Sequence, residues 1–175
     1  MNTIKNNFKA FSVKWSLLFV IMAVITTLWI VVIFSFSSTK GEKSASQSQT
    51  VTQSVVRVFD KDYTMPEKVE PKSRDQIYDT VLRKLAHLSI YACLGVLMFL
   101  TVKTLTKKEK YYFAAKLSVP LSILISIGDE YNQTLTEGRS GRFYDVCIDT
   151  AGILIGTFII IFIVKKLLKN KAKAA

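Results

Sequence analysis

The sequence predicts an all-α integral membrane protein with four transmembrane helices, both termini in the cytoplasm and a long first outer loop. Three observations lead to this fold class: four long stretches with few or no charges, short basic segments beside them, and a composition that is both apolar and basic. Half of the 175 residues are hydrophobic, the mean hydropathy is +0.29, and Lys and Arg outnumber Asp and Glu by 24 to 13. Because the charges are separated from the apolar stretches, we expect no nucleic-acid partner for the basic side chains.

Each apolar stretch is long enough to cross a bilayer. About 20 apolar residues span a hydrocarbon core roughly 30 Å thick. The first stretch is too long for the apolar part of a secretory signal and no small-residue cleavage site follows, so we expect an uncleaved anchor. The third carries Lys116, whose amine can reach the interface, and Pro120, which a spanning helix tolerates. The predicted spans are about 15–36, 85–102, 112–128 and 143–164.

The distribution of Lys and Arg predicts the orientation of the spans. The amino-terminal arm (1–14), the segment 103–116 and the tail from Lys165 together carry 13 Lys and Arg and one acid, Glu109. The other side has 11 Lys and Arg and the remaining 12 acids. We therefore expect a cytoplasmic basic arm, a four-helix membrane domain over residues 15–165, and a basic cytoplasmic tail over residues 166–175.

The first outer loop, residues 37–84, is long. Its start (37–54) is polar and rich in small residues, which predicts a flexible strap. The stretch around Pro66 and Pro71 is not expected to be helical throughout. Apolar residues then recur every three or four positions, so a helix capped by Ser73 or Asp75 should run directly into the second span.

Three helices bring ionisable side chains to the outer end of the predicted bundle. Spacings of three and four residues place these side chains on one face of each helix, and a short loop with two arginines joins the last two helices. The candidate ligand-binding residues are Arg83, Lys84, His87, Tyr91, Asp129, Glu130, Gln133, Arg139, Arg142, Asp145 and Asp149.

Two interpretations of this polar cluster remain open. An ionisable group costs at least about 2.5 kcal/mol near the centre of a spanning helix, so such groups usually face one another or a wet cavity. In the first interpretation they only hold the bundle together, for instance by pairing Arg83 or Lys84 with Asp145 or Asp149. In the second they line a pocket for an anionic headgroup from the outer leaflet, in which arginines bind phosphate or carboxylate as forks.

Catalytic residues cannot be assigned from the sequence, and we expect a binding protein rather than an enzyme. If the protein is an enzyme, the candidates are His87 as general acid or base and Asp129 or Glu130 as the acid that orients it. No nucleophile or phosphate-loop motif occurs, and we expect neither a cofactor nor a metal site. Cys93 and Cys147 are expected to be small buried residues without a disulfide.

Gly152 and Gly156 form a G-x-x-x-G pattern on the fourth span. Such a pattern lets another helix approach closely. The pattern therefore permits a homo-oligomer through this face.

Three motifs occur in order along the chain. They are R-K-x-A-H-x-x-x-Y (Arg83 to Tyr91), D-E-x-x-Q (Asp129 to Gln133) and G-R-x-G-R-x-x-D-V-x-x-D-x-x-G (Gly138 to Gly152), preceded by F-S-F-S-S at the end of the first span. Together they resemble the VanZ-like family of small bacterial membrane proteins, named for a teicoplanin-resistance protein. The chain departs from the family pattern at Glu137, where Pro is usual, and at Asp149, where Asn is common.

The resemblance covers about residues 15–165 and implies a multi-pass protein of the bacterial cell membrane. Some members are linked to reduced sensitivity to lipid-bearing glycopeptide antibiotics, and no chemical activity is implied. We expect the partners to be membrane lipids with an anionic or polyprenyl-linked headgroup. The protein would bind or modify a cell-envelope lipid of the outer leaflet, or limit the access of such antibiotics. The alternative is a membrane enzyme that acts on a lipid-linked cell-wall precursor with His87 as acid or base.

Overall fold

The computed structural model describes residues 2–64, 66, 73–106 and 111–173, and over these residues the chain forms helices and no strands. The helices are α1 (Asn2–Ser37), α2 (Gly41–Val56), α3 (Arg74–Thr104), α4 (Tyr111–Thr134) and α5 (Phe143–Lys173). In the described part of the chain, four helical segments are long and apolar enough to cross a membrane, which agrees with the predicted number of spans. They are Trp15–Ser37, Arg74–Thr104, Tyr111–Thr134 and Phe143–Leu167.

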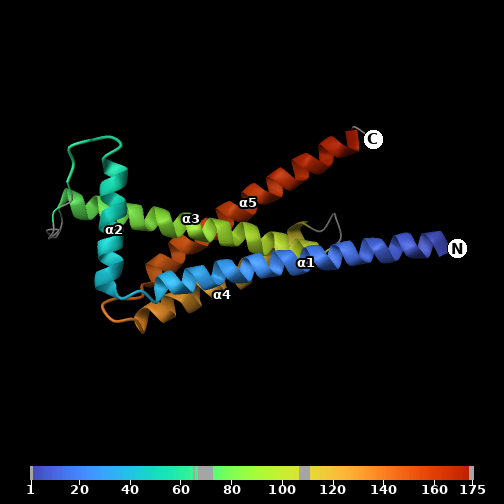
Figure 1. Ribbon diagram of the computed structural model, residues 1–175, viewed down its shortest axis with the longest axis horizontal. Coiled ribbons are helices and arrows are strands. Elements are labelled where there is room, and N and C mark those ends of the chain that lie inside the picture. Colours follow the sequence, from blue (N-terminus) through green and yellow to red (C-terminus); the bar gives the residue numbers. More distant parts are fainter. Residues whose placement is uncertain (1, 65, 67–72, 107–110, 174–175) are drawn as a thin grey trace.

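Helix α3 is at the centre of the bundle and contacts each of the other four helices. Both chain termini lie at one end of the bundle, and α2 lies crosswise to α3 at the opposite end, near the α4–α5 loop (Figure 1). This arrangement agrees with an even number of crossings. The orientation relative to the cytoplasm stays a prediction from the charges, of which Lys107, Lys108 and Lys110 lie outside the described residues.

Helices α3 and α5 touch along their backbones. A Cβ atom on Gly156 would lie 2.0 Å from the carbonyl oxygen of Ala92, and one on Gly152 would lie 2.4 Å from that of Leu88. In the same way, a Cβ atom on Gly95 of α3 would lie 2.5 Å from the carbonyl oxygen of Ile153 on α5. The G-x-x-x-G face is therefore filled by α3 of the same chain, and we call this contact the glycine seam.

The buried face of α4 consists of small residues at a spacing of four. Ala114, Ser118, Ser122 and Ser126 are all at most 1% exposed. The Ser122 hydroxyl donates to the carbonyl oxygen of Ser118 at 2.9 Å, so its polar group is satisfied within the helix. This face lets neighbouring helices approach and explains why α4 has the lowest hydropathy of the four candidate spans.

The strap predicted for residues 37–54 is wrong, because most of this segment is helix α2. Hydroxyl residues recur every four positions on it, and Thr52 is fully buried. Ser48 and Thr52 both donate to Oδ1 of Asp79 on α3, the latter at 3.2 Å. The helix forms despite its polar composition because its buried hydroxyl groups have a carboxylate partner.

The start of α2 lies against the α4–α5 loop. The Gly41 amide donates to the carbonyl oxygen of Glu137 at 3.0 Å. A Cβ atom on Gly41 would lie 2.1 Å from the carbonyl oxygen of Gly138, which itself has a φ of 73°. Glycine is needed at both positions, because Gly41 permits the close approach and Gly138 adopts the left-handed conformation.

Helix α3 begins where the sequence predicted. Ser73 is its N-cap, and the Ser73 side chain accepts from the Gln76 amide at 3.2 Å. Tyr63 donates to the Asp75 carboxylate at 2.6 Å, and burial together with this bond raises the pKa of Tyr63 to about 12. Pro71 and most of the segment just before α3 lie outside the described residues.

The prediction that both cysteines are buried is wrong. Cys93 and Cys147 are free thiols on exposed surfaces of α3 and α5. A thiol behaves as a small apolar group, so it is compatible with a helix surface that faces lipid.

Replacement of Gly156 by Ala should destabilise the protein, because the new methyl group would overlap the α3 backbone. Overpacking of this kind costs about 1–3 kcal/mol. Gly128→Ala is the matched control, since its Cβ would meet only the Phe34 ring, at 3.7 Å. Thermal unfolding in detergent should show a lower midpoint for Gly156→Ala alone, and equal midpoints would contradict the seam.

Candidate functional site

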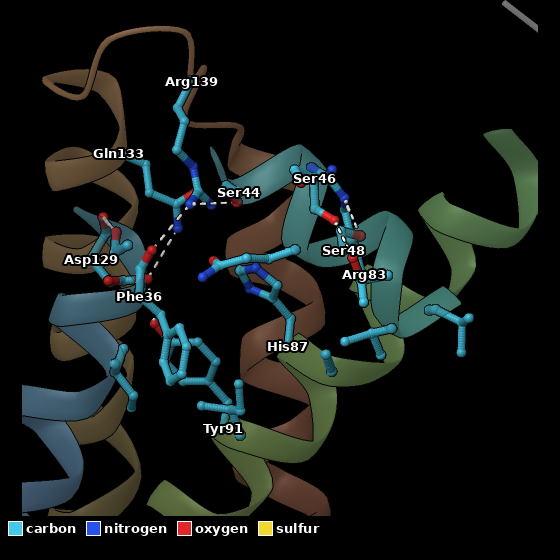
Figure 2. A pocket seen from close by; sticks show the side chains of 18 residues that line it. Phe36, Ser44, Ser46, Ser48, Arg83, His87, Tyr91, Asp129, Gln133 and Arg139 are labelled. Carbon is cyan, nitrogen blue, oxygen red and sulfur yellow. Dashed lines mark hydrogen bonds between the residues drawn. The ribbon is translucent and has the colours of Figure 1, made fainter. Parts of the chain in front are cut away.

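A cavity of about 640 Å³ lies between α1, α2, α3 and α4. Its α2 residues place it at the end of the bundle where α2 lies crosswise to α3 (Figure 1). One part of its wall is apolar and includes Ile33, Phe36, Leu82, Ala86 and Ile90. The polar part contains six of the residues that the sequence predicted for ligand binding. They are Arg83, His87, Tyr91, Asp129, Gln133 and Arg139 (Figure 2).

His87 of α3 is held by a buried carboxylate of α5. Its Nδ1 lies 3.1 Å from Oδ1 of Asp149, which is 0% exposed. The second oxygen of Asp149 accepts from the Ser126 hydroxyl of α4 at 2.8 Å. Nε2 of His87 has no hydrogen-bond partner among the described residues, and the ring lies toward the cavity (Figure 2).

Asp129 of α4 forms a second polar centre in the cavity wall. Its Oδ2 accepts from the Tyr91 hydroxyl at 2.9 Å and from the Gln133 amide at 3.1 Å. Its Oδ1 is buried and has no hydrogen-bond partner within the described part of the chain. A buried oxygen without a donor costs about 1–3 kcal/mol, so this atom is suited to accept from a ligand.

Arg139 reaches into the cavity from the α4–α5 loop (Figure 2). It donates to Oε1 of Gln133 at 2.8 Å, and to the Phe36 carbonyl and the Ser44 hydroxyl at 3.3 Å each. All three acceptors are neutral, and no described carboxylate lies within ion-pair distance of its guanidinium. Burial, followed by the nearby Arg83, lowers the pKa of Arg139 below its ordinary value.

Arg83 is a second guanidinium at the cavity wall. Its Nε lies 3.1 Å from Oδ2 of Asp79 and donates to the Ser48 hydroxyl at 2.8 Å. The ion pair that the sequence suggested for Arg83, with Asp145 or Asp149, does not form. Arg83 pairs instead with Asp79, one helical turn earlier, because both side chains lie on the same side of α3.

The remaining predicted residues do not line the cavity. The Lys84 amine lies over the Tyr144 ring, 4.4 Å from its centre, and so does not pair with a carboxylate of α5. The Arg142 side chain is exposed, while its backbone amide donates to Oε1 of Glu130 at 2.6 Å. Asp145 is partly buried on α5, one turn before Asp149.

The part of the site that α2 contributes was not predicted from the sequence. Five polar side chains of this helix line the cavity, and the only signal for them was the recurrence of hydroxyl residues at a helical spacing. The role of Asp79 as the anchor of α2 and that of Ser126 as a donor to Asp149 were also missed. The missed lining residues are Ser44, Ser46, Gln47, Ser48 and Thr50.

The ionisable groups of the cavity are arranged for hydrogen bonding. In the described part of the chain, no group of three His, Cys, Asp or Glu residues is placed to hold a metal ion. The carboxylates of Asp129 and Asp149 instead accept from neighbouring side chains. The site therefore offers a ligand two guanidinium groups, one imidazole nitrogen and one carboxylate oxygen.

The comparison with protein families identifies the chain. The family model described as VanZ/LLP1 matches residues 19–165, which is most of the sequence. The chain belongs to the VanZ/LLP1 family. No curated protein and no solved structure matches it. In this VanZ/LLP1 protein, each of the three sequence motifs contributes residues to the cavity wall or to its support.

Removal of the Asp79 carboxylate should loosen α2. Asp79→Ala removes the acceptor of Ser48 and Thr52, and hydrogen bonds to a charged group contribute about 1.5–3 kcal/mol each. Hydrogen exchange of peptides from residues 41–56 should become roughly tenfold faster or more, because 1.4 kcal/mol corresponds to a factor of ten.

Glu137→Gln is the control for this experiment. The ion pair of Glu137 with Lys40 is about three-quarters exposed on both sides, and such pairs contribute little. If the Asp79 and Glu137 variants exchanged α2 amides at the same rate, the anchoring role of Asp79 would be wrong.

Proposed function

We propose that this VanZ/LLP1 protein binds the anionic headgroup of a cell-envelope lipid, or of another lipid-bearing molecule, from the outer leaflet of the bacterial cell membrane. The observation that carries the proposal is the half-buried guanidinium of Arg139, which faces the cavity with neutral partners alone. Membership of the family supports a membrane protein with VanZ-like features. The ligand class comes from the chemistry of the cavity.

The guanidinium of Arg139 favours an anion. A partly buried cation without an ion-pair partner is costly, and a second guanidinium nearby increases this cost, while the more distant carboxylates, Asp129 among them, offset part of it. Arg83 is such a neighbour of Arg139. A phosphate or carboxylate between them would offset both effects and would accept from either guanidinium in a forked geometry.

The shape of the site favours an amphiphile. The cavity lies at the ends of candidate membrane spans, and Ile33, Phe36 and Ile90 form an apolar part of its wall. Phe36 is 59% exposed, so this wall continues to the outer surface of the bundle. A lipid chain could follow this apolar surface into the bilayer while its headgroup occupies the polar part.

The free oxygen of Asp129 can accept from a donor on the ligand. A headgroup that carries a hydroxyl or ammonium group would satisfy Oδ1, which no described residue does. Lipid-linked wall precursors and lipid-bearing glycopeptides such as teicoplanin both combine anions, donors and an apolar chain. Limiting the access of such antibiotics is therefore a second form of the same proposal.

The alternative function is a membrane enzyme that acts on a lipid-linked cell-wall precursor with His87 as acid or base. The pairing of His87 with the fully buried Asp149 favours it, because such a carboxylate orients a catalytic imidazole. Binding and turnover of the same lipid distinguish the two functions.

The outer location of the cavity can be tested by labelling single cysteines in intact cells. In a background without Cys93 and Cys147, a cysteine at position 140 should react with a membrane-impermeant maleimide and one at position 108 should not. The excess of lysine on the opposite side is the reason for this expectation. Labelling at 108 but not at 140 would invert the topology and place the cavity inside the cell.

Arg139→Ala should weaken binding of an anionic amphiphile by about 10- to 100-fold, since a charge-assisted bond contributes roughly 1.5–3 kcal/mol. Native mass spectrometry of the protein with farnesyl diphosphate gives the measurement.

Arg142→Ala is the matched control, because the Arg142 side chain is exposed and its backbone amide, which binds Glu130, is retained. Equal loss of binding in both variants would show a diffuse effect of net charge and would contradict a site at Arg139.

A further inference from the structure

We propose that the cavity hydrolyses the phosphoanhydride bond of a lipid diphosphate, with His87 as the general base that activates water. The inference rests on the proposed binding of an anionic headgroup and adds a reaction to it. It starts from the pairing of His87 with Asp149 and from the two guanidinium groups that line the same cavity.

The imidazole is positioned as a base. A carboxylate accepts hydrogen bonds, so the Asp149 oxygen 3.1 Å from Nδ1 holds the ring proton on that nitrogen. The lone pair then lies on Nε2, which has no partner among the described residues. Asp149 is itself fixed from α4 by the Ser126 hydroxyl at 2.8 Å. Asp149 and Ser126 are therefore positioning residues, and His87 is the group that would meet the reacting water.

The other ring contact of His87 also fixes its orientation. The Tyr91 ring stacks on the imidazole with 6.3 Å between centres and 21° between planes. The Tyr91 hydroxyl in turn donates to Asp129 at 2.9 Å. Three helices thus restrain one imidazole, which is more support than a surface histidine needs and is typical of a catalytic group.

The guanidinium groups supply the electrostatic part of the reaction. In phosphoryl transfer, negative charge on the transferred group and on the leaving oxygen is stabilised by fixed cations. Arg139 has only neutral hydrogen-bond partners, and Arg83 uses its Nε for Asp79 and Ser48. The terminal nitrogens of Arg83 make no hydrogen bond to the described residues, so they remain available to the substrate.

The arrangement favours an anhydride over a simple phosphate ester. Hydrolysis of an ester expels an alkoxide, which needs a proton donor, whereas hydrolysis of a diphosphate expels a phosphate, a much better leaving group. The carboxylate in the cavity wall, Asp129, accepts from Tyr91 and Gln133 and is therefore placed as an acceptor rather than as such a donor.

The step balances without a further reactant. The water oxygen forms a bond to the terminal phosphorus, and the bond from that phosphorus to the bridging oxygen breaks. Nε2 of His87 takes the proton of the attacking water and later releases it to solvent. The products are the lipid monophosphate and inorganic phosphate.

The test uses the full chain in lipid nanodiscs with farnesyl diphosphate as the probe. Release of inorganic phosphate is followed together with binding by native mass spectrometry. We expect the wild-type protein and the Arg142→Ala control to release phosphate. His87→Ala should lower kcat by about 10²- to 10⁴-fold while it still binds the probe, since general base catalysis contributes a factor of that size.

Two further experiments separate chemistry from structure. Added imidazole should restore part of the activity of His87→Ala, which would not occur if the residue only supported the fold. Asp149→Asn should lower kcat with little change in KM, because the charge that stabilises the protonated ring is lost while the binding groups remain.

The outcomes are distinct. Binding without phosphate release would overturn the hydrolysis and leave the proposed binding function intact, whereas absence of binding would overturn the proposed function itself. Equal rates for wild type and His87→Ala would overturn the role of the base. Equal hydrolysis of inorganic pyrophosphate would overturn the lipid substrate, and hydrolysis of phosphatidic acid instead of farnesyl diphosphate would overturn the anhydride.

Discussion

The glycine seam between α3 and α5 is the contact on which the site depends. Gly152 lies against the backbone of Leu88, the residue next to His87, and three positions before Gly152 is Asp149. The backbones can touch there because no Cβ atom separates them, and only this approach brings the buried carboxylate to 3.1 Å from the imidazole. A wider crossing would leave the buried Asp149 without its histidine partner, and a buried carboxylate with too few partners is disfavoured in a low-dielectric interior.

The fold was largely predictable from hydropathy, since each span must present apolar side chains to lipid whatever it packs against. Helix α2 was not predictable from hydropathy. Its residues are polar, and its stability comes from the carboxylate of Asp79 on another helix. A hydroxyl group every fourth residue was visible in the sequence. This pattern indicates a buried helix face only when an acceptor such as the Asp79 carboxylate lies opposite it. Composition describes exposure to water or lipid and does not reveal which buried hydrogen bonds form.

For the site, spacing correctly placed Arg83, His87 and Tyr91 on one face of α3, and it could not determine their partners. The rotation of each helix about its axis decides which carboxylate faces which cation, and that rotation follows from packing at the glycine seam. Hence Arg83 binds Asp79 of its own helix, while Asp149 binds the histidine. The position of the Arg139 side chain could not be predicted either, because it depends on the hydrogen bonds that this loop residue makes with Ser44 and Phe36.

The carboxylate at Asp149 gives this chain a property that an amide would lack. An Asn oxygen at this position would accept from Nδ1 and keep the ring oriented. It would not stabilise a protonated imidazole, because it carries no charge. Orientation of His87 suffices for binding a headgroup, whereas removal of a proton from water needs both orientation and charge. The acid at this position is therefore what connects the architecture of the cavity to the proposed hydrolysis.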